Sequence, residues 1–177
     1  WGTIKDPDGN IRNRIADKKH HITDIKYIID HINSVKPGKI LDIGSGPGWL
    51  LSEISPEFSK YGNEIDDDAI KLSKDSSINF SNGNITEQIY KANYFDIIVM
   101  HHVIEHVNEP IEFIVSIKRI LKDKGILILG TPDFDSGCAR LFKSNYRLLH
   151  DPTHISLFSN ESIHRFLRDH GFKIMKV

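Results

Sequence analysis

The sequence predicts an α/β protein with a doubly wound, mostly parallel sheet and helices on both faces. The first observation is that short apolar runs alternate along the chain with stretches of helical periodicity. The second is that the strongest runs, Phe95–Met100 and Ile126–Gly130, are apolar at almost every position. Strands buried on both faces have this pattern, and such strands belong mostly to parallel sheets.

The chain begins with a helix ahead of the first strand. Residues 1–38 form a polar segment followed by a helix, because apolar residues recur at helical spacing from Ile22 to Val35 and stop at Pro37. The apolar run Lys39–Ile43 is the first strand. We expect the N-terminal segment and its helix to belong to the same domain as the rest of the chain.

The next elements alternate between helix and strand. Helical patterns over Trp49–Phe58 and Asp68–Lys74 flank a candidate strand at Lys60–Ile65. A weak strand at Ile78–Phe80 follows. A turn at residues 82–84 ends it, because asparagine and glycine favour turns.

The strand Phe95–Met100 precedes a helix that begins at Pro110, since proline favours the first helical turn. We expect its apolar side chains to face the core, and Gly125 to cap it before the strand Ile126–Gly130. The positions expected to face inward are Ile111, Ile114, Val115, Ile117, Ile120 and Leu121.

A long polar and aromatic segment, 131–158, interrupts the alternation of strands and helices. A helix from Ser159 or Asn160 to Arg168 follows, because serine and asparagine are good N-cap residues. Phe172–Val177 is the last candidate strand. The core therefore extends over residues 39–177, with the long segment as an insertion.

Length and composition limit the classes of protein. The chain has 177 residues, 23 Lys plus Arg against 24 Asp plus Glu, and a formal net charge of -1. One domain is expected at this length, and a near-neutral chain lacks the basic footprint of a nucleic-acid binder. No apolar stretch approaches the roughly 20 residues that span a bilayer, and the first residues lack a signal-peptide pattern. With a single cysteine, Cys138, this predicts a cytoplasmic protein that binds neither nucleic acid nor membrane.

A glycine-rich turn after the first strand is the clearest functional signal. It contains Gly44, Gly46 and Gly48, which leave the backbone open to a ligand beyond the carboxyl end of the sheet. The spacing does not fit a dinucleotide fingerprint, because the third glycine position is Trp49, and this disfavours a nicotinamide oxidoreductase. Asp42 lies just before the turn, where its carboxylate repels phosphate and favours a cationic group such as an ammonium.

A second acidic residue, Glu64, follows at the end of the second strand. It lies at the distance at which an acidic side chain takes ribose hydroxyls. Asp42 and Glu64 together favour a nucleoside with a positively charged, phosphate-free tail, and S-adenosylmethionine has that chemistry. The alternative is that Glu64 is a solvated charge, since three aspartates follow it.

Further motifs follow the glycine turn in order. They are Gly62–Asp66, Phe95–Val99, Val103–Val107, Gly125–Pro132, Pro152–Ser159 and Gly171-Phe172. In order and spacing, the set resembles the class I S-adenosylmethionine-dependent methyltransferases, and among them the ubiquinone-pathway type. The resemblance implies a Rossmann-like fold. Its usual last, antiparallel strand is expected to be missing, because the chain stops at Val177.

The resemblance implies how the methionine end of the cofactor is held. Backbone groups at Gly44, Ser45 and Gly46, supported by Asp42, would bind its ammonium and carboxylate groups.

The resemblance also assigns the nucleoside end and the reactive methyl group. Glu64 would take the ribose hydroxyls, and Ile65 would pack on the adenine. Asn84, next to Ile85, stands where the family often has an aspartate on the adenine amino group, and its amide oxygen can accept the same hydrogen bond. His101, directly after the fourth strand, would line the pocket near the methyl group.

Ten histidines are many for a chain of this length. Methyl transfer to a hydroxyl or amine requires removal of a proton, and histidine suits that task near neutral pH. His101 and His154 are the candidate catalytic residues, the second of them in the segment 131–158. The other histidines of these two regions are His102, His106 and His150.

The run from His102 to His106 also suggests a metal. It matches a zinc-peptidase motif, but that motif needs a continuous helix, and this run directly follows a buried strand. Small-RNA terminal methyltransferases and ubiquinone-pathway O-methyltransferases resemble the region with Glu-x-x-Glu-His, which binds a divalent metal. We expect no metal, and keep a site of His102, Glu105 and His106 as the alternative.

These inferences together predict a methyltransferase that transfers a methyl group from S-adenosylmethionine to a small-molecule acceptor at oxygen. The acceptor atom rests on family analogy alone. The segment 131–158 would lie on the acceptor side. The alternatives are a cofactor-binding module without turnover and a metal-dependent methyltransferase. The sequence does not predict the oligomeric state.

Overall fold

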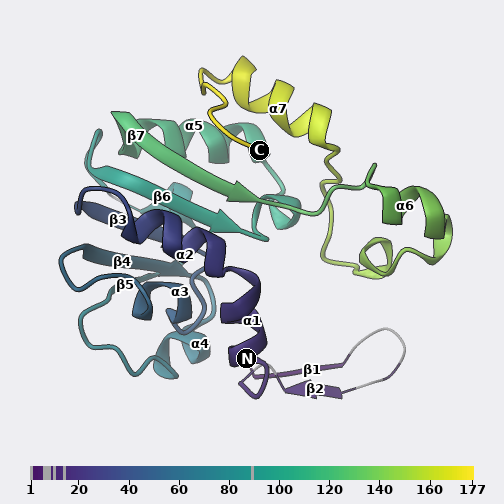
Figure 1. Ribbon diagram of the computed structural model, residues 1–177, viewed down its shortest axis with the longest axis horizontal. Coiled ribbons are helices and arrows are strands. Elements are labelled where there is room, and N and C mark those ends of the chain that lie inside the picture. The colour runs from purple at the N-terminus through teal and green to yellow at the C-terminus, as the bar shows by residue number, and fades with distance from the viewer. Residues whose placement is uncertain (1, 6–8, 10, 14, 89) are drawn as a thin grey trace.

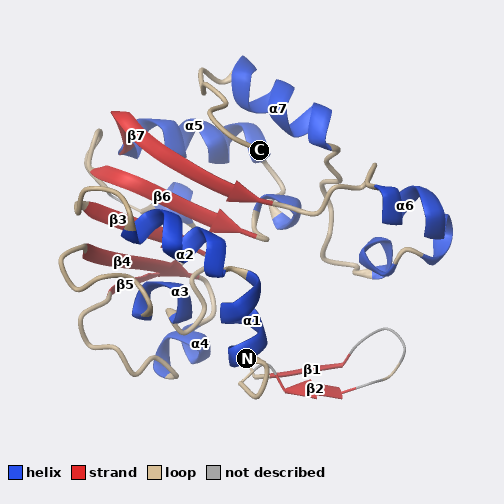
Figure 2. Ribbon diagram, in the orientation of Figure 1, coloured by secondary structure: helices blue, strands red, loops and turns tan. Residues whose placement is uncertain are grey.

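The computed structural model describes residues 2–5, 9, 11–13, 15–88 and 90–177. Its centre is a five-stranded sheet of order β5-β4-β3-β6-β7 in which every pair is parallel (Figures 1 and 2). The strands are β3 (Lys39–Ile43), β4 (Ser59–Glu64), β5 (Asn79–Asn82), β6 (Phe95–His101) and β7 (Leu121–Gly130). The predicted α/β fold with a parallel sheet is confirmed.

Helices α3 (Trp49–Ser52), α4 (Asp67–Lys71) and α5 (Pro110–Ile120) lie between strands of this sheet in the sequence. Helices α1 (Lys18–Asp24) and α2 (Lys26–Asn33) precede the sheet, and α6 (Gly137–Phe142) and α7 (Asn160–Asp169) follow it. Short 3-10 helices are η1 (Ile85–Glu87), η2 (Ile104–His106), η3 (Lys143–Asn145) and η4 (Arg147–His150). Within the described residues, no helix combines the length and the apolar character that crossing a bilayer requires.

The sheet has a hydrophobic cluster on each face because side chains alternate along each strand. Leu41 and Ile98 face one cluster, which includes apolar residues of α5 and α7. Ile40 and Val99 face the other, which includes residues of α2 and α3. Figure 1 shows the same arrangement, with α2 and α3 in front of the sheet and α5 behind it. The strands are therefore buried on both faces, as their sequences predict.

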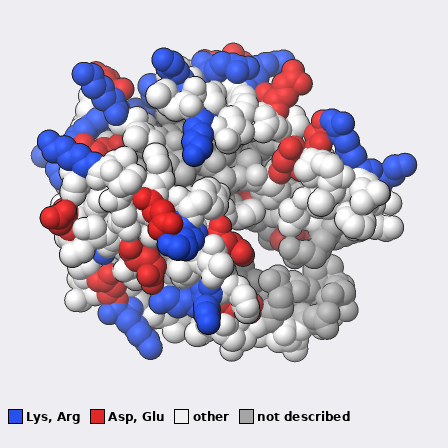
Figure 3. Space-filling model, in the orientation of Figure 1, with Lys and Arg blue, Asp and Glu red and all other residues white. Residues whose placement is uncertain are grey.

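The strand order creates the position for a ligand. The neighbours β3 and β6 are not consecutive in the chain, so the connections from their carboxyl ends run in opposite directions. Ligands of doubly wound sheets bind at such a switch point. All five arrows point to the same edge in Figure 1, and Figure 3 shows the molecule hollowed beyond that edge, beside the part that carries α6. Acidic and basic side chains are mixed on this face.

The strand expected at Phe172–Val177 is not formed. Gly171 ends α7 with a left-handed backbone (φ +79°), and its carbonyl accepts a hydrogen bond from the Lys118 ammonium at 3.0 Å. The Phe172 ring then lies under that ammonium and packs against the α5 and α7 cluster. Packing of the side chain on the helices replaces pairing with the sheet, so that prediction is wrong.

Several boundaries also differ from the prediction. Ile111 and Val115 are 59% and 54% exposed, so the buried stripe of α5 is narrower than expected. The helix ends at Ile120, and Gly125 lies inside β7 at a shift of register and does not cap the helix. The helix expected over Trp49–Phe58 is shorter: it forms α3, which ends at Ser52, ahead of Pro56.

The N-terminal segment is more regular than its polar sequence indicates. β1 (Thr3–Lys5) and β2 (Ile11–Asn13) form an antiparallel pair, and α1 precedes the expected helix α2. α1 has no buried residue, so its sequence lacks the stripe of apolar residues from which a helix is predicted.

Candidate active site

The glycine turn is fixed between β4 and the segment after β6. Gly44 and Gly46 have φ of 70° and 53°, in the left-handed region that glycine adopts at low cost. The N–H groups of Gly44 and Ser45 both donate to the carbonyl of Asn63, at 2.8 and 3.1 Å. A Cβ at Gly44 would lie 2.7 Å from Val103 Cγ2. The turn therefore requires glycine both for its backbone angle and for its space.

Asn63 ties the ends of three strands together. Its buried side-chain amide donates to the carbonyls of Ser81 and Gly83, at 3.4 and 3.0 Å, and to Ser81 Oγ at 3.1 Å. Its carbonyl holds the glycine turn. Asn63 was not among the predicted site residues. A polar side chain next to Glu64 in a buried strand was the available signal.

Glu64 is a preorganised acceptor. Its Oε2 accepts the Gly46 N–H at 2.8 Å, and its Oε1 accepts the N–H groups of Ile65 and Asp66 at 2.8 and 3.0 Å. The residue is 8% exposed, so it is not a solvated surface charge. Each carboxylate oxygen has two lone pairs, which leaves one on Oε2 for a ligand hydroxyl.

Asp42 lies on β3 directly opposite Gly62 of β4 and Val99 of β6. It is 5% exposed, and among the described residues no hydrogen bond or ion pair involves its carboxyl group. Burial and then the neighbouring Glu64 raise the pKa of Asp42 to about 8. This end of the sheet thus has two acidic groups and favours a cation.

The residues assigned to the adenine differ in how far their side chains are accessible to a ligand. Ile65 is 75% exposed, so its side chain is free to pack on a flat ligand. Asn84 Oδ1 accepts the N–H of Thr86 at 3.2 Å and begins η1. Ile85 is buried in the core, which leaves only its backbone for a ligand.

His101 ends β6 and packs against β7. Its ring occupies the space above Gly130, where a Cβ would overlap it, and meets the His102 ring edge-on at 4.4 Å between centroids. Burial, His102 and His21 lower the pKa of His101 to about 4. Its imidazole is therefore neutral at pH 7 and a weak base.

His21 joins this region from α1. Its ring centroid lies 5.9 Å from that of Trp49, at the start of α3. Burial lowers the pKa of His21, Asp24 opposes the shift, and His102 adds to it. No motif or spacing predicted this histidine beside the site.

Glu105 connects the segment after β6 with the insertion. It is fully buried, and its carboxylate accepts hydrogen bonds from His102 Nδ1 at 3.0 Å and Thr131 Oγ1 at 2.9 Å. Its backbone carbonyl accepts the N–H groups of Ile155 and Ser156 at 2.9 and 3.0 Å. Burial alone would raise the pKa of Glu105, but these side-chain hydrogen bonds and one from its own backbone outweigh it and lower the pKa.

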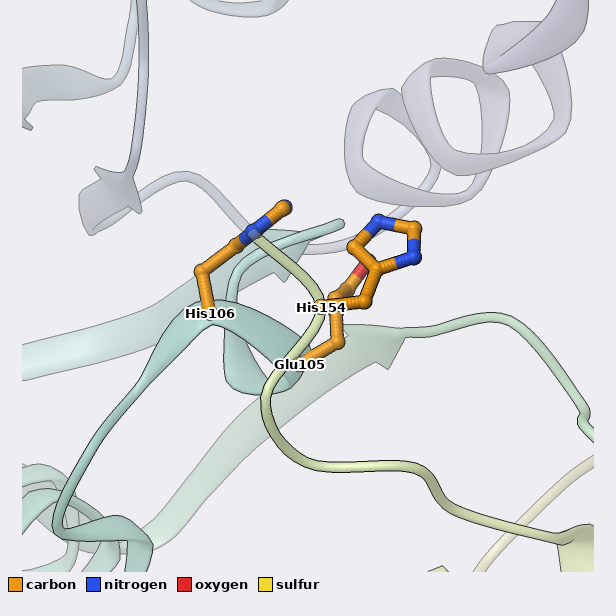
Figure 4. A group of neighbouring side chains, drawn as sticks. All are labelled: Glu105, His106 and His154. Atoms are coloured by element: carbon orange, nitrogen blue, oxygen red, sulfur yellow. The ribbon is translucent and has the colours of Figure 1, made fainter. Parts of the chain in front are cut away.

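Glu105, His106 and His154 converge, and one ligand-type atom of each lies within 4.8 Å of the others (Figure 4). His106 Nδ1 contacts the Thr153 carbonyl at 2.9 Å, and His154 Nδ1 contacts the Leu148 carbonyl at 2.8 Å. A carbonyl only accepts, so both Nδ1 atoms carry a proton and the Nε2 atoms are the ones left for other partners. His154 Nε2 lies 3.8 Å from Asp151 Oδ2.

The structure thus brings the two histidine-containing regions together, through Glu105 and His154. The side chains of Arg147 and His150 lie outside the described part of the chain. The peptidase interpretation fails, because the run after β6 forms only the short 3-10 helix η2. The structure also groups Glu105 and His106 with His154, while His102 is hydrogen-bonded to Glu105.

Comparison with known families agrees with this geometry. Residues 10–177 match the model of a family described as methyltransferase domain. A ubiquinone biosynthesis O-methyltransferase of Rickettsia typhi is 29% identical over 138 residues, which cover 72% of this chain and 54% of the relative. An uncharacterized methyltransferase of Schizosaccharomyces pombe is 27% identical over 128 residues, covering 63% and 45%. The chain spans about half the length of these curated relatives.

Solved structures share the fold. A methyltransferase from Archaeoglobus fulgidus, described as dependent on S-adenosylmethionine, has a TM-score of 0.74 at 20% identity and is covered to 69%, against 88% of this chain. The complex of the Haloferax volcanii Trm112 methyltransferase activator with a methyltransferase gives 0.76 at 14% identity, covering 92% of this chain and 73% of that one. At these identities the likeness concerns the fold alone.

Proposed function

Because the chain belongs to the family of S-adenosylmethionine-dependent methyltransferases, we propose that it transfers a methyl group from that cofactor to an oxygen of a small-molecule acceptor. The observation that supports this most is the pair of buried carboxyl groups, Asp42 and Glu64, beside an open glycine turn at the switch point. A cationic, phosphate-free nucleoside complements that pair.

The residues present fit the cofactor. Glu64 keeps a lone pair that a ribose hydroxyl would occupy, and the Asp42 carboxyl group would face the ammonium group. The backbone of Gly44, Ser45 and Gly46 would hold the methionine end. When bound, the cofactor supplies an electrophilic methyl group on sulfur, and the protein then has to align the acceptor and remove its proton.

The two candidate catalytic histidines have different chemistry. The low pKa of His101 suits a neutral group that lines the pocket and hydrogen-bonds the acceptor. His154 is oriented by the Leu148 carbonyl at Nδ1, and its Nε2 lies 3.8 Å from Asp151 Oδ2, an arrangement of carboxylate and imidazole that suits a general base. It lies in the segment 131–158, which we assign to the acceptor side.

Calorimetry with S-adenosylmethionine, S-adenosylhomocysteine and NAD tests the proposal. We expect both sulfur compounds to bind and NAD not to bind. Tight NAD binding without adenosylmethionine binding would overturn the proposal. Cofactor binding with no methyl transfer to any oxygen acceptor would favour a binding module instead.

His154→Ala should lower turnover by about 10²-fold or more while cofactor affinity stays within twofold, because loss of a general base slows proton removal only. The measurement is S-adenosylhomocysteine formation with an accepted substrate, alongside calorimetry. His31→Ala, on the exposed face of α2, is the control. Equal turnover in His154→Ala and His31→Ala would return His154 to a structural role.

A divalent cation at Glu105, His106 and His154 is a second candidate. Two imidazoles and one carboxylate suit Mn²⁺, Fe²⁺ or Zn²⁺, and the Nδ1 contacts with backbone carbonyls orient both rings as metal ligands require. The cation would orient the acceptor oxygen and lower its pKa. The Glu105 carboxylate already accepts two hydrogen bonds, so the cation would compete with His102 or Thr131 for it.

Titration of the protein with Mn²⁺, followed by electron paramagnetic resonance, tests this site. Binding is expected to be lost in His154→Ala and kept in His31→Ala. Identical Mn²⁺ binding by the two variants, or none by the unchanged chain, would rule the cation out.

A further inference from the structure

Asp42 and Glu64 lie close together on one face of the sheet. Asp42 pairs with Gly62 in the parallel register, and Glu64 follows Gly62 by two residues, so both side chains point to the same face. Both are buried, at 5% and 8% exposure. Two carboxylates that share a buried position do not both ionise readily.

Among the described residues, the backbone supplies hydrogen bonds to one of the two carboxyl groups only. Glu64 accepts three N–H groups, from Gly46, Ile65 and Asp66, and hydrogen bonds of this kind stabilise a carboxylate. No described residue donates a hydrogen bond to the Asp42 carboxyl. A negative charge is therefore costly on Asp42, and its pKa is raised to about 8.

The other titratable groups around this face do not offset that charge. His101 lies on the same face of β6, two residues beyond the partner of Asp42, and is neutral because its pKa is lowered to about 4. Lys60 is on the same face of β4, but its ammonium group lies 3.8 Å from Asp75. On α1, His21 has a lowered pKa, and α3 contributes no charged residue.

We propose that Asp42 holds a proton while the cofactor site is empty and loses it when the ammonium group of the cofactor binds. This inference rests on the proposed function, because it takes S-adenosylmethionine or its product as the ligand. The O–H bond of Asp42 breaks, the proton passes to the buffer, and the ammonium group becomes the counter-ion of the carboxylate. Binding is thus an exchange of a proton for a cation, and Asp42 selects ligands with a positive charge at that position.

Calorimetry in buffers of different ionisation enthalpy measures the protons released on binding. S-adenosylhomocysteine is the probe, at pH 6.5, where its amino group (pKa about 8) is already protonated. We expect release of close to one proton per ligand by the unchanged chain. Asp42→Asn should release close to none and should bind about tenfold more weakly. Asp30→Asn, on the exposed side of α2, should behave like the unchanged chain.

Thermal unfolding without any ligand gives an independent measurement. The pKa of Asp42 is raised in the folded chain, so the folded state binds more protons than the unfolded state between pH of about 4 and 8. Stability from this group therefore falls as the pH rises through that window. The Tm of Asp42→Asn relative to the unchanged chain should increase from pH 5 to pH 8 and stay constant above pH 8.

The two measurements distinguish a failure of the Asp42 proposal from a failure of the proposed function. Equal proton release by Asp42→Asn and the unchanged chain, or a Tm difference that does not change with pH, would overturn the role of Asp42. If the unchanged chain binds neither S-adenosylhomocysteine nor S-adenosylmethionine, the proposed function fails. The Tm comparison then still decides whether the empty site holds a proton.

Discussion

Glu64→Ala is expected to weaken the binding of S-adenosylhomocysteine by about 1–3 kcal/mol, near the upper limit, because a charged acceptor of the ribose hydroxyls is removed. The structure adds a second reason. The N–H groups of Gly46, Ile65 and Asp66 lose their acceptor, so the glycine turn keeps only its bonds to the Asn63 carbonyl as its link to β4. The Kd from calorimetry measures the effect.

Two variants control this experiment. Glu64→Gln keeps one carbonyl oxygen as an acceptor and loses the charge, so it should lie between Glu64→Ala and the unchanged chain. Glu57→Ala removes an exposed carboxylate just before β4, the strand that Glu64 ends, and should leave Kd unchanged. An unchanged Kd in Glu64→Ala would show that this carboxylate serves the fold only.

The sheet was predictable because the sequence pattern of its main strands is local and can be recognised without knowledge of their neighbours. The runs Lys39–Ile43 and Phe95–Met100 are mostly apolar, and a glycine turn directly after the first one marks the switch point.

The chain after α7 was not predictable in this way. Its last residues, Phe172–Val177, have the alternation of a strand, but they do not pair with β7, the edge strand of the described sheet. Phe172 instead packs on the apolar surface of α5 and α7. A single sequence shows the propensity of a segment and not the tertiary contact that overrides it.

The same distinction between local pattern and tertiary contact applies to the candidate site. Asp42 and Glu64 could be assigned from their positions at strand ends, because that position alone fixes where their side chains lie. The partners of Glu105 could not be, since Thr131 and Ile155 reach it through contacts between segments 26 and 50 residues apart in the chain. His21 was missed for the same reason.

Glu105→Ala is expected to give the largest loss of stability, about 3 kcal/mol, because it removes a fully buried carboxylate that accepts two side-chain hydrogen bonds and leaves a cavity. The half-buried Thr131 and the exposed His102 both lose their acceptor. For a chain of this size, that corresponds to a fall in Tm of roughly 6–12 °C. Glu112→Ala, which removes an exposed carboxylate of α5, is the matched control and should change Tm by less than about 2 °C.

The pH dependence distinguishes a charged network from simple packing. The pKa of Glu105 is lowered in the folded chain, so its contribution to stability is complete above the ordinary glutamate pKa and is lost as the pH falls through the lowered value. The Tm difference between the unchanged chain and Glu105→Gln should therefore be constant from pH 6 to pH 8 and shrink below about pH 4.5. Glutamine keeps the size of the side chain, so a difference that persists undiminished at low pH would mean that Glu105 stabilises the insertion by shape and not by charge.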